Sequence, residues 1–312
     1  MLHQKTRSNL GDFENRNTFT KVDGLDNVTA VSAGDHHTII KKVDGTLWAT
    51  GKNNGYQFGL GTAFDKTHTF QKISTIPDVK SIVCGRHNSF ILKTDGTLLV
   101  AGDNFTGNSG FPQSETHLKE FTEVLKDVTS VSTSSIKSSH SIALKKDGTL
   151  WSTGDNSQGQ LGVKDKVNRY KFTQVVGIND VTNINAGCNT TILTNTNLET
   201  SLIYNNELVN LLKGIPVKDM CAWDHALILS QNGSLYVCGN NGKGELGLGN
   251  NETQDIFVKN NIIDNVKKIA CGWEYSIILK NDGTLWVTGN NMYGQLGLGS
   301  VEKVHEFTQI KQ

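Results

Sequence analysis

Short runs of apolar and β-branched residues, separated by turn residues, fill most of this 312-residue chain. The first complete set occupies residues 19–22, 28–34, 37–42 and 46–51, with Asp-Gly at two of the turns between them. Runs of this length and composition are typical of strands. No stretch repeats apolar residues at the i, i+3, i+4 and i+7 spacing of an amphipathic helix. The pattern therefore predicts an all-β chain with almost no helix.

One five-residue phrase, Asp-Gly-Thr-Leu-Trp or a close variant, recurs along the chain. The copies are residues 44–48, 95–99, 147–151, 232–236 and 282–286. Their glycines are 51, 52, 85 and 50 residues apart, and the gap of 85 holds one degenerate copy. Asp-Gly between two apolar runs indicates a hairpin, because glycine accepts the positive φ of a tight turn. A constant period of this length indicates stacked supersecondary units, and we count six.

Small antiparallel sheets at this period fit a β-propeller better than a sandwich, a β-helix or a helical solenoid. We expect about six four-stranded blades, with seven blades, one of them irregular, as the alternative. We assign residues 1–18 to an N-terminal extension that includes part of a preceding loop, and residues 19–312 to a single propeller domain.

Two parts of the repeat pattern depart from regularity. The fourth repeat is degenerate and short: Leu198 replaces the turn glycine, Ser201 replaces the tryptophan, and the glycine-rich loop is missing. Phe-Thr begins a run at both ends of the chain, at residues 19–20 and 307–308, one more time than the hairpin phrase requires. Such an overhang suggests that the N- and C-terminal strands pair, and we expect residues 307–310 to pair with a strand near the N-terminus.

A glycine-rich loop also recurs, at residues 55–61, 159–162, 244–249 and 294–299. The repeated order Ala/Cys-Gly-x-x-His-Ser/Thr, Asp-Gly-Thr-Leu-Trp, Gly-x-Asn, Gly-Gln-Leu-Gly resembles the regulator of chromosome condensation repeat family, over residues 19–307. This resemblance implies a β-propeller, usually of seven blades, that acts through protein contacts on one face. Members of the family act as nucleotide-exchange factors for small GTPases, as inhibitors of a β-lactamase, and as a plant ultraviolet-B photoreceptor.

The composition of the chain limits the classes of partner that we expect. Thirty basic and thirty acidic residues give no net charge, which argues against nucleic acid as a direct partner. No apolar run approaches 18 residues, so we expect no membrane insertion, and the N-terminus lacks the apolar core of a signal peptide. We expect a monomer in the cytoplasm, or one delivered into the cytosol of a host cell. The five cysteines form no CxxC pair, and we expect Cys84 and Cys271 to be packed structural thiols in a reducing compartment.

We find no motif for covalent catalysis, a metal or a cofactor. Residues 242–247 match GxGxxG, but they lie in the recurrent loop and no helix follows to bind a phosphate. His37, His140 and His225 share one repeat position, which favours a recurring structural hydrogen bond over a catalytic base. We therefore expect no enzymatic chemistry by the chain's own residues.

The residues that vary most in chemical kind are the two that follow the inner-strand glycine of each repeat. They include Ser138-Ser139 and Cys188-Asn189, and our candidate partner-binding residues are Asp35, His36, Arg86, His87, Trp223, Asp224, Trp273 and Glu274. We expect these turns to form a ring around one end of the central channel. Tryptophan and arginine are enriched at binding hot spots, although Trp223 and Trp273 as plugs of the channel mouth remain an alternative. We expect Trp48, Trp151 and Trp286 to pack between blades.

The resemblance and the composition together favour an exchange-factor-like regulator or effector that acts on a small GTPase. The alternative is a binding scaffold or enzyme inhibitor without exchange activity. Trp223 and Trp273 match the Gly-Trp-Arg-His-Thr tryptophans of the photoreceptor, but Asp224 and Glu274 replace its arginines and a third tryptophan is missing, which argues against light sensing.

Overall fold

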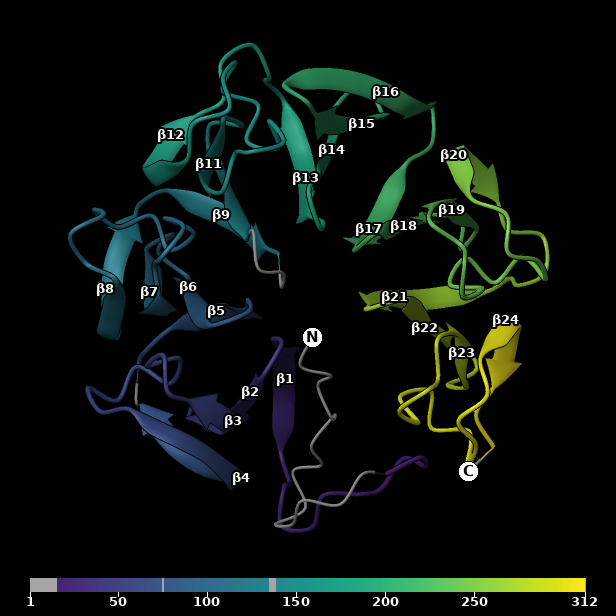
Figure 1. Ribbon diagram of the computed structural model, residues 1–312, viewed down its shortest axis with the longest axis horizontal. Helices are drawn as coiled ribbons and strands as arrows, with labels where there is room; N and C mark the ends of the chain where they lie inside the picture. The colour runs from purple at the N-terminus through teal and green to yellow at the C-terminus, as the bar shows by residue number, and fades with distance from the viewer. Residues whose placement is uncertain (1–15, 75, 135–138, 312) are drawn as a thin grey trace.

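The computed structural model describes residues 16–74, 76–134 and 139–311, and it shows six four-stranded antiparallel sheets arranged in a ring (Figure 1). No helix occurs in these residues. The prediction of an all-β propeller with six blades is therefore confirmed. Each sheet takes four consecutive strands, and the first strand of each sheet lies nearest the centre of the ring.

The strands fall into four concentric sets. The innermost strands are β1 (Val28–Ala33), β5 (Val79–Cys84), β9 (Val128–Thr133), β13 (Val181–Ala186), β17 (Val217–Ala222) and β21 (Val266–Gly272). The second strands are β2 (His37–Lys42), β6 (Asn88–Lys93), β10 (His140–Lys145), β14 (Thr191–Asn195), β18 (His225–Ser230) and β22 (Tyr275–Lys280). The third strands are β3 (Leu47–Asn53), β7 (Leu98–Asp103), β11 (Leu150–Gly154), β15 (Glu199–Tyr204), β19 (Leu235–Gly239) and β23 (Leu285–Gly289). The outermost strands are β4 (Phe64–Ser74), β8 (His117–Leu125), β12 (Arg169–Gln174), β16 (Glu207–Lys213), β20 (Gln254–Lys259) and β24 (Val304–Gln309).

The recurrent phrase builds the hairpin between the second and third strands. In the first blade, Asp44 Oδ1 accepts the backbone N–H of Thr46 at 2.9 Å and its hydroxyl at 2.7 Å. Gly45 supplies the positive φ of the turn, 81°. The Thr46 hydroxyl oxygen in turn accepts the indole N–H of Trp48 at 2.9 Å. Each conserved element of the phrase thus has a local role: the carboxylate caps the turn and the threonine orients the ring.

The three hairpin tryptophans differ in their surroundings. Trp151 and Trp286 are half-buried and pack against the apolar clusters between their blades and the preceding ones, as expected. Trp48 is also half-buried, but it lies on the face of the first blade that points away from the second and joins no such cluster. The expectation of inter-blade packing is therefore wrong for Trp48.

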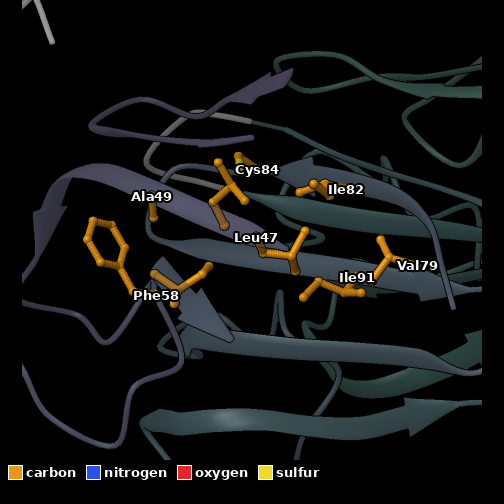
Figure 2. Packing of buried hydrophobic residues seen from close by; sticks show 9 residues of the cluster. Leu47, Ala49, Phe58, Val79, Ile82, Cys84 and Ile91 are labelled. Carbon is orange, nitrogen blue, oxygen red and sulfur yellow. The ribbon is translucent and has the colours of Figure 1, made fainter. Parts of the chain in front are cut away.

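Apolar side chains from facing sheets form the core between consecutive blades. At the first interface, Leu47, Ala49 and Phe58 of the first blade meet Val79, Ile82, Cys84 and Ile91 of the second (Figure 2). Cys84 is 5% exposed, and burial raises the pKa of its thiol to about 12. This thiol is a small packing group, as its repeat position predicts.

Cys271, by contrast, is bonded through its sulfur to Cys221, so the expectation of a free thiol is wrong here. The two residues occupy the same repeat position on the adjacent inner strands β17 and β21, with Cα atoms 5.6 Å apart. The sequence did not indicate this pair. Cys271 is followed by the repeat glycine, whereas Cys221 is followed by Ala222, so the motif does not place the two cysteines at one repeat position.

The first and sixth blades lack the close packing that joins the other neighbours. Inner strands of consecutive blades contact one another from β1 round to β21, but in the described residues β21 and β1 make no comparable contact (Figure 1). Val31 on β1 is 67% exposed, whereas its counterparts Ile82 and Val131 are 9% and 7% exposed. The apolar face of the first blade is therefore partly open.

The two ends of the chain do meet, but at a different place from the one expected. Residues 307–310 do not pair with an N-terminal strand: β24 pairs with β23, and the N–H of Ile310 donates to the Leu285 carbonyl at 2.9 Å. These residues complete the sixth sheet, which already uses their hydrogen-bonding groups.

The N-terminal segment instead bonds to the glycine-rich loop of the sixth blade. Thr18 bridges to Leu298, and the N–H of Gly299 donates to the Asn17 carbonyl at 2.7 Å. The ring of Phe19 lies so close to Gly297 that a Cβ there would clash. Phe307 lies against Gly247 in the same way, so Phe19 takes the place that the outer strand of a following blade would take.

Candidate protein-binding face

The candidate residues lie at one end of the ring, which we call the turn face. It consists of the turns between first and second strands and the loops between third and fourth strands, which share an end because the strands are antiparallel. One backbone hydrogen bond ties turn to loop in five blades. The donors and acceptors are Lys52 to His36 (2.9 Å), Asp103 to His87 (2.9 Å), Asp155 to Ser139 (3.1 Å), Asn240 to Asp224 (3.1 Å) and Asn290 to Glu274 (2.7 Å).

Neighbouring turns are also bonded to each other, as a ring requires. The N–H of Asp35 donates to the Gly85 carbonyl at 3.3 Å, and the N–H of Cys188 donates to the Trp223 carbonyl at 3.1 Å. Ser138 of the third turn lies outside the described residues. Backbone hydrogen bonds thus join neighbouring turns at the first and fourth interfaces, an arrangement that favours a preorganised binding surface.

The first four candidates form one charged cluster on the first two blades. Asp35 Oδ2 lies 3.4 Å from Arg86 Nε and 3.6 Å from His36 Nε2. The rings of His36 and His87 stack with centroids 5.2 Å apart. Burial, reinforced by the Arg86 charge, lowers the pKa of His87 to about 4. At neutral pH this imidazole is therefore uncharged, and the Arg86 guanidinium lies against the Asp35 carboxylate.

Beside this cluster lies a carboxyl–imidazole pair that the sequence analysis missed. Asp103 Oδ1 is 3.0 Å from His117 Nε2, and the rings of Tyr56 and Phe105 meet the His117 ring edge-on. Burial raises the pKa of Asp103 to about 7, against the opposing effect of Arg86. Asp103 comes at the end of β7, at the variable position of the Gly-x-Asn motif, and His117 comes at the start of β8, so the pair forms through the pairing of these two strands.

The other four candidates lie on the fifth and sixth blades. Trp273 is 45% exposed, while Trp223 is half-buried and Asp224 is exposed beside it. Glu274 Oε2 accepts the side-chain N–H of Asn290 at 2.8 Å, which fixes its carboxylate. The structure therefore divides the candidates into two groups, an ion-pair cluster on the first and second blades and two aromatic–acidic pairs on the fifth and sixth.

The repeated histidines serve the fold, as expected. Nε2 of His37, His140 and His225 lies 2.8, 3.0 and 2.8 Å from a hydroxyl on the next blade, that of Ser89, Thr191 and Ser276 respectively. Each hydroxyl donates onward to a loop carbonyl, so it accepts from the imidazole, whose proton is on Nε2. Burial lowers the pKa of the three imidazoles to about 3, 4 and 4. They are neutral structural links.

In the described ranges, no group of three or more His, Cys, Asp or Glu side chains is arranged to hold a metal ion. The GxGxxG match at 242–247 is part of the propeller loop, where Leu246 is fully buried. Across the part of the chain that the structure describes, no helix has the length and hydrophobicity to cross a membrane.

Comparison with known proteins identifies the repeats. Two family models described as "Regulator of chromosome condensation (RCC1) repeat" match the chain and together cover more than half of it. One matches residues 28–57, 79–108, 128–160 and 266–295, and the other 44–92, 147–193 and 232–279. The chain belongs to the RCC1 repeat family.

Several curated relatives carry similar repeats. The chain is 30% identical over 259 residues to the human X-linked retinitis pigmentosa GTPase regulator, covering 75% of the chain and 25% of the relative. It is 25% identical over 252 residues to the Arabidopsis thaliana ultraviolet-B receptor UVR8, covering 79% and 49%. It is 26% identical over 224 residues to the human probable E3 ubiquitin-protein ligase HERC6, covering 70% and 19%. The chain thus spans less than half the length of each relative.

Solved structures show the same fold. Yeast RCC1 (Prp20), in a crystal structure with Kap60, superposes with a TM-score of 0.81 at 19% identity, covering 91% of this chain and 75% of that one. Human WBSCR16 gives a TM-score of 0.78 at 20% identity, covering 92% and 83%. At these identities the likeness establishes the fold alone.

Proposed function

We propose that this propeller binds a small GTPase through its turn face and promotes release of the bound nucleotide. The observation that carries the proposal is the pair of aromatic–acidic turns on adjacent blades, Trp223-Asp224 and Trp273-Glu274, with one indole exposed. A GTPase regulator among the relatives supports it. So does the solved structure of Prp20p from Saccharomyces cerevisiae, described together with its binding properties to Gsp1p and histones.

Exchange of this kind needs contact and charge, without a covalent step. The indoles supply apolar area of the type that anchors interfaces. A GTPase holds its nucleotide through a lysine and Mg²⁺ at the phosphates. Carboxylates such as Asp224 and Glu274, held against that site, compete with the phosphates for these cations and weaken nucleotide binding.

The test measures release of a fluorescent guanine nucleotide from a panel of purified small GTPases. We expect the chain to accelerate release from at least one of them. Trp223→Ala and Trp273→Ala should each weaken the interaction by about 2 kcal/mol, or about 30-fold. Val43→Ala is the matched control, because Val43 is 72% exposed but follows β2 at the opposite end of the ring. If no GTPase responds, or if both tryptophan variants act like wild type, the proposal is wrong.

A binding scaffold or inhibitor without exchange activity is the second candidate. It is favoured by the spread of names among the relatives, which include a ubiquitin ligase and a light receptor. The variant Asp224→Asn/Glu274→Gln separates the two. An exchange factor should lose release rate more than affinity in this variant, whereas a scaffold binds its partner with no change in release rate.

A further inference from the structure

In five of the six blades, the loop between the third and fourth strands folds in the same way. In the first, second, third and fifth blades it plugs the interface with the next blade. Each loop begins with a buried asparagine whose Oδ1 accepts the N–H of the residue five positions later. The pairs are Asn53–Phe58 (2.9 Å), Asn104–Ser109 (3.2 Å), Asn156–Leu161 (3.0 Å), Asn241–Leu246 (3.0 Å) and Asn291–Leu296 (3.0 Å). All five inserted residues are fully buried or nearly so.

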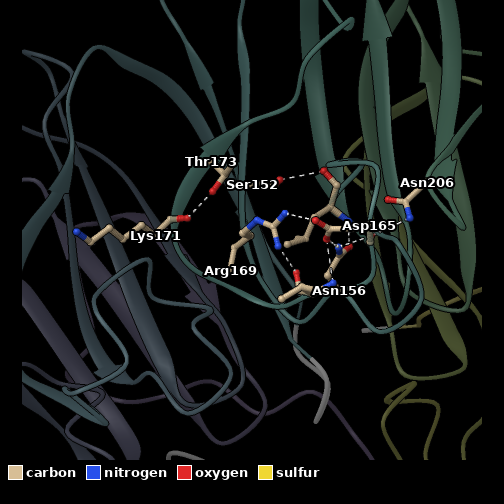
Figure 3. Close-up of polar contacts among 9 residues, drawn as sticks. Ser152, Asn156, Asp165, Arg169, Lys171, Thr173 and Asn206 are labelled. Atoms are coloured by element: carbon tan, nitrogen blue, oxygen red, sulfur yellow. Dashed lines mark hydrogen bonds and ion pairs between the residues drawn. The ribbon is translucent and has the colours of Figure 1, made fainter.

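The loop of the third blade shows how such a plug is held (Figure 3). Asn156 Nδ2 donates to the Asp165 carbonyl at 2.6 Å, and the Asp165 carboxylate is 2.6 Å from Arg169 Nη2. Asn206 of the fourth blade donates to the same carbonyl at 2.8 Å. The loop is therefore bonded to its own blade and to the next one.

The fourth blade has no plug. β15 and β16 are joined by a tight turn at Asn205 and Asn206, with φ of 52° and 64°. A cavity of about 460 Å³ remains between the fourth and fifth blades, where a loop would otherwise insert. This volume lies within the range of known ligand sites, about 300–1,000 Å³. We call this cavity the slot.

The walls of the slot are apolar and its rim is polar and aromatic. The walls are Ile192, Leu202 and Leu211 on the fourth blade and Ala222, Ala226 and Cys238 on the fifth. The rim includes Tyr204, Trp223, Asp224, Gln254 and Asp255. Trp223 and Asp224 therefore belong both to the slot and to the turn face.

The sequence of the fifth blade is adjusted to the missing loop. At four other interfaces a hydroxyl on the second strand donates to a carbonyl of the plugging loop. The pairs are Ser89–Gln57 (2.8 Å), Ser141–Asn108 (2.6 Å), Thr191–Gln160 (3.0 Å) and Ser276–Glu245 (2.7 Å). The fifth blade has Ala226 at this position. No hydroxyl is therefore left without an acceptor where the loop carbonyl is missing. The apolar side chain of Ala226 is thus consistent with the absence of a plugging loop from the slot.

The charges of the slot have one sign. Of the residues that line it, Asp224 and Asp255 are the charged ones, and none is lysine or arginine. Burial lowers the pKa of His225 to about 4, so this imidazole adds no positive charge at neutral pH. Burial also raises the pKa of Cys188 to about 12, with Asp224 contributing, so the thiol stays protonated. The aromatic rim favours a cation as well.

We propose that the slot binds a short segment of the partner protein in which an apolar side chain lies next to a lysine or arginine. The apolar side chain enters as Leu161 and Leu246 do at other interfaces, and the basic group lies against Asp224 and Asp255. The partner thus supplies the missing plug from outside the chain. This inference rests on the proposed role of the turn face in protein binding and specifies what that face recognises.

The test titrates the full chain with blocked tetrapeptides and follows backbone amide NMR signals. Acetyl-Gly-Lys-Leu-Gly-amide should shift signals of residues 188–192 and 222–226. Acetyl-Gly-Glu-Leu-Gly-amide and acetyl-Gly-Lys-Ser-Gly-amide should each bind about tenfold more weakly, because they lose the ion pairs or the apolar contact. Asp224→Asn/Asp255→Asn should abolish the preference for lysine over glutamate. Asp65→Asn, an exposed carboxylate on β4, should retain it.

Filling the slot provides the second arm. Replacing Asn205-Asn206 with the third-blade loop, residues 156–168, should abolish peptide binding. This replacement also removes the Asn206 bond to the third-blade loop, so Ala226→Met, which narrows the slot and leaves that bond in place, is the second filled variant and should weaken peptide binding. Shifts confined to other residues, equal binding of the three peptides, or binding that survives both filled variants would overturn the proposal. No GTPase is present, so this result is independent of the nucleotide-release assay.

Discussion

The buried histidines that link neighbouring blades should make the ring sensitive to mild acid. The folded-state pKa values of His37, His140 and His225 are lowered to about 3, 4 and 4 by burial, while an unfolded histidine titrates near 6.5. Because the folded values are the lower ones, the unfolded chain takes up protons first as the pH falls. Their contribution to stability is present above about pH 6.5 and is lost on acidification toward pH 4.

The magnitude follows from these three histidines, from His87 on the turn face, and from one opposing group, Asp103. At pH 5.5 each unfolded histidine is mostly protonated and each folded one is not, a loss of about 1.4 kcal/mol per site or about 4 kcal/mol for the three. Asp103 acts in the opposite direction: its pKa is raised to about 7 by burial, so the folded state gains a proton as the pH falls. Protonation of Asp103 therefore offsets about 1 kcal/mol of the loss in stability, after a discount for its partial exposure to solvent. His87, whose pKa burial also lowers to about 4, adds about 1 kcal/mol to the loss after the same discount for partial exposure. The net loss between pH 7.5 and 5.5 is therefore about 4 kcal/mol.

Urea unfolding followed by tryptophan fluorescence at the two pH values measures this loss. His140→Asn is the matched variant, because Asn88 occupies the same position in the second blade and donates to the Ser109 hydroxyl at 3.2 Å. The variant should lose about 1.4 kcal/mol of the pH dependence. Equal stability at both pH values would refute the structural role of the imidazoles, as would an unchanged pH dependence in the variant.

Two further predictions concern the inner ring and the packing of loops on outer strands. Reducing the Cys221–Cys271 bond should lower the free energy of unfolding by about 2–4 kcal/mol in thermal or urea melts, and Cys221→Ala/Cys271→Ala should be insensitive to reductant. Gly247→Ala should cost about 2–3 kcal/mol, since it combines a positive φ of 62° with a clash against the Phe307 ring, whereas Gly177→Ala, at φ 91° in open space, should cost about 1 kcal/mol. Equal costs for the two glycines would show that the ring contact is unimportant.

Much of the architecture could be predicted from the sequence because its signals are local. Asp44, Gly45, Thr46 and Trp48 interact within one hairpin, so their spacing alone predicts it. The disulfide could not be predicted because it depends on the distance between adjacent inner strands. The place where the two ends of the chain meet was also predicted wrongly. A Phe-Thr run can be a strand in a sheet, as at Phe307, or a segment packed on a loop, as at Phe19, and its sequence does not distinguish the two.

The candidate binding face was only partly visible in the sequence. Repeat positions that vary led to the turn residues. Asp103 also lies at a variable repeat position, the x of Gly-x-Asn, but its contact with His117 arises only from the pairing of β7 with β8. The missing loop of the fourth repeat was apparent from the sequence. The consequence of the missing loop was not apparent. Only the structure shows that loops of this kind plug the interface with the following blade, and that Trp223 therefore lies at the edge of a slot.

Amide hydrogen exchange of the chain, alone and with the GTPase whose nucleotide release it accelerates most, tests the role of the turn face most directly. We predict protection of the turns at residues 187–190, 222–224 and 272–274. The hairpin turns at the opposite end, residues 43–46, 146–149 and 281–284, should exchange at unchanged rates. Protection of the hairpin turns with none at residues 222–224 and 272–274 would contradict a binding role for the turn face.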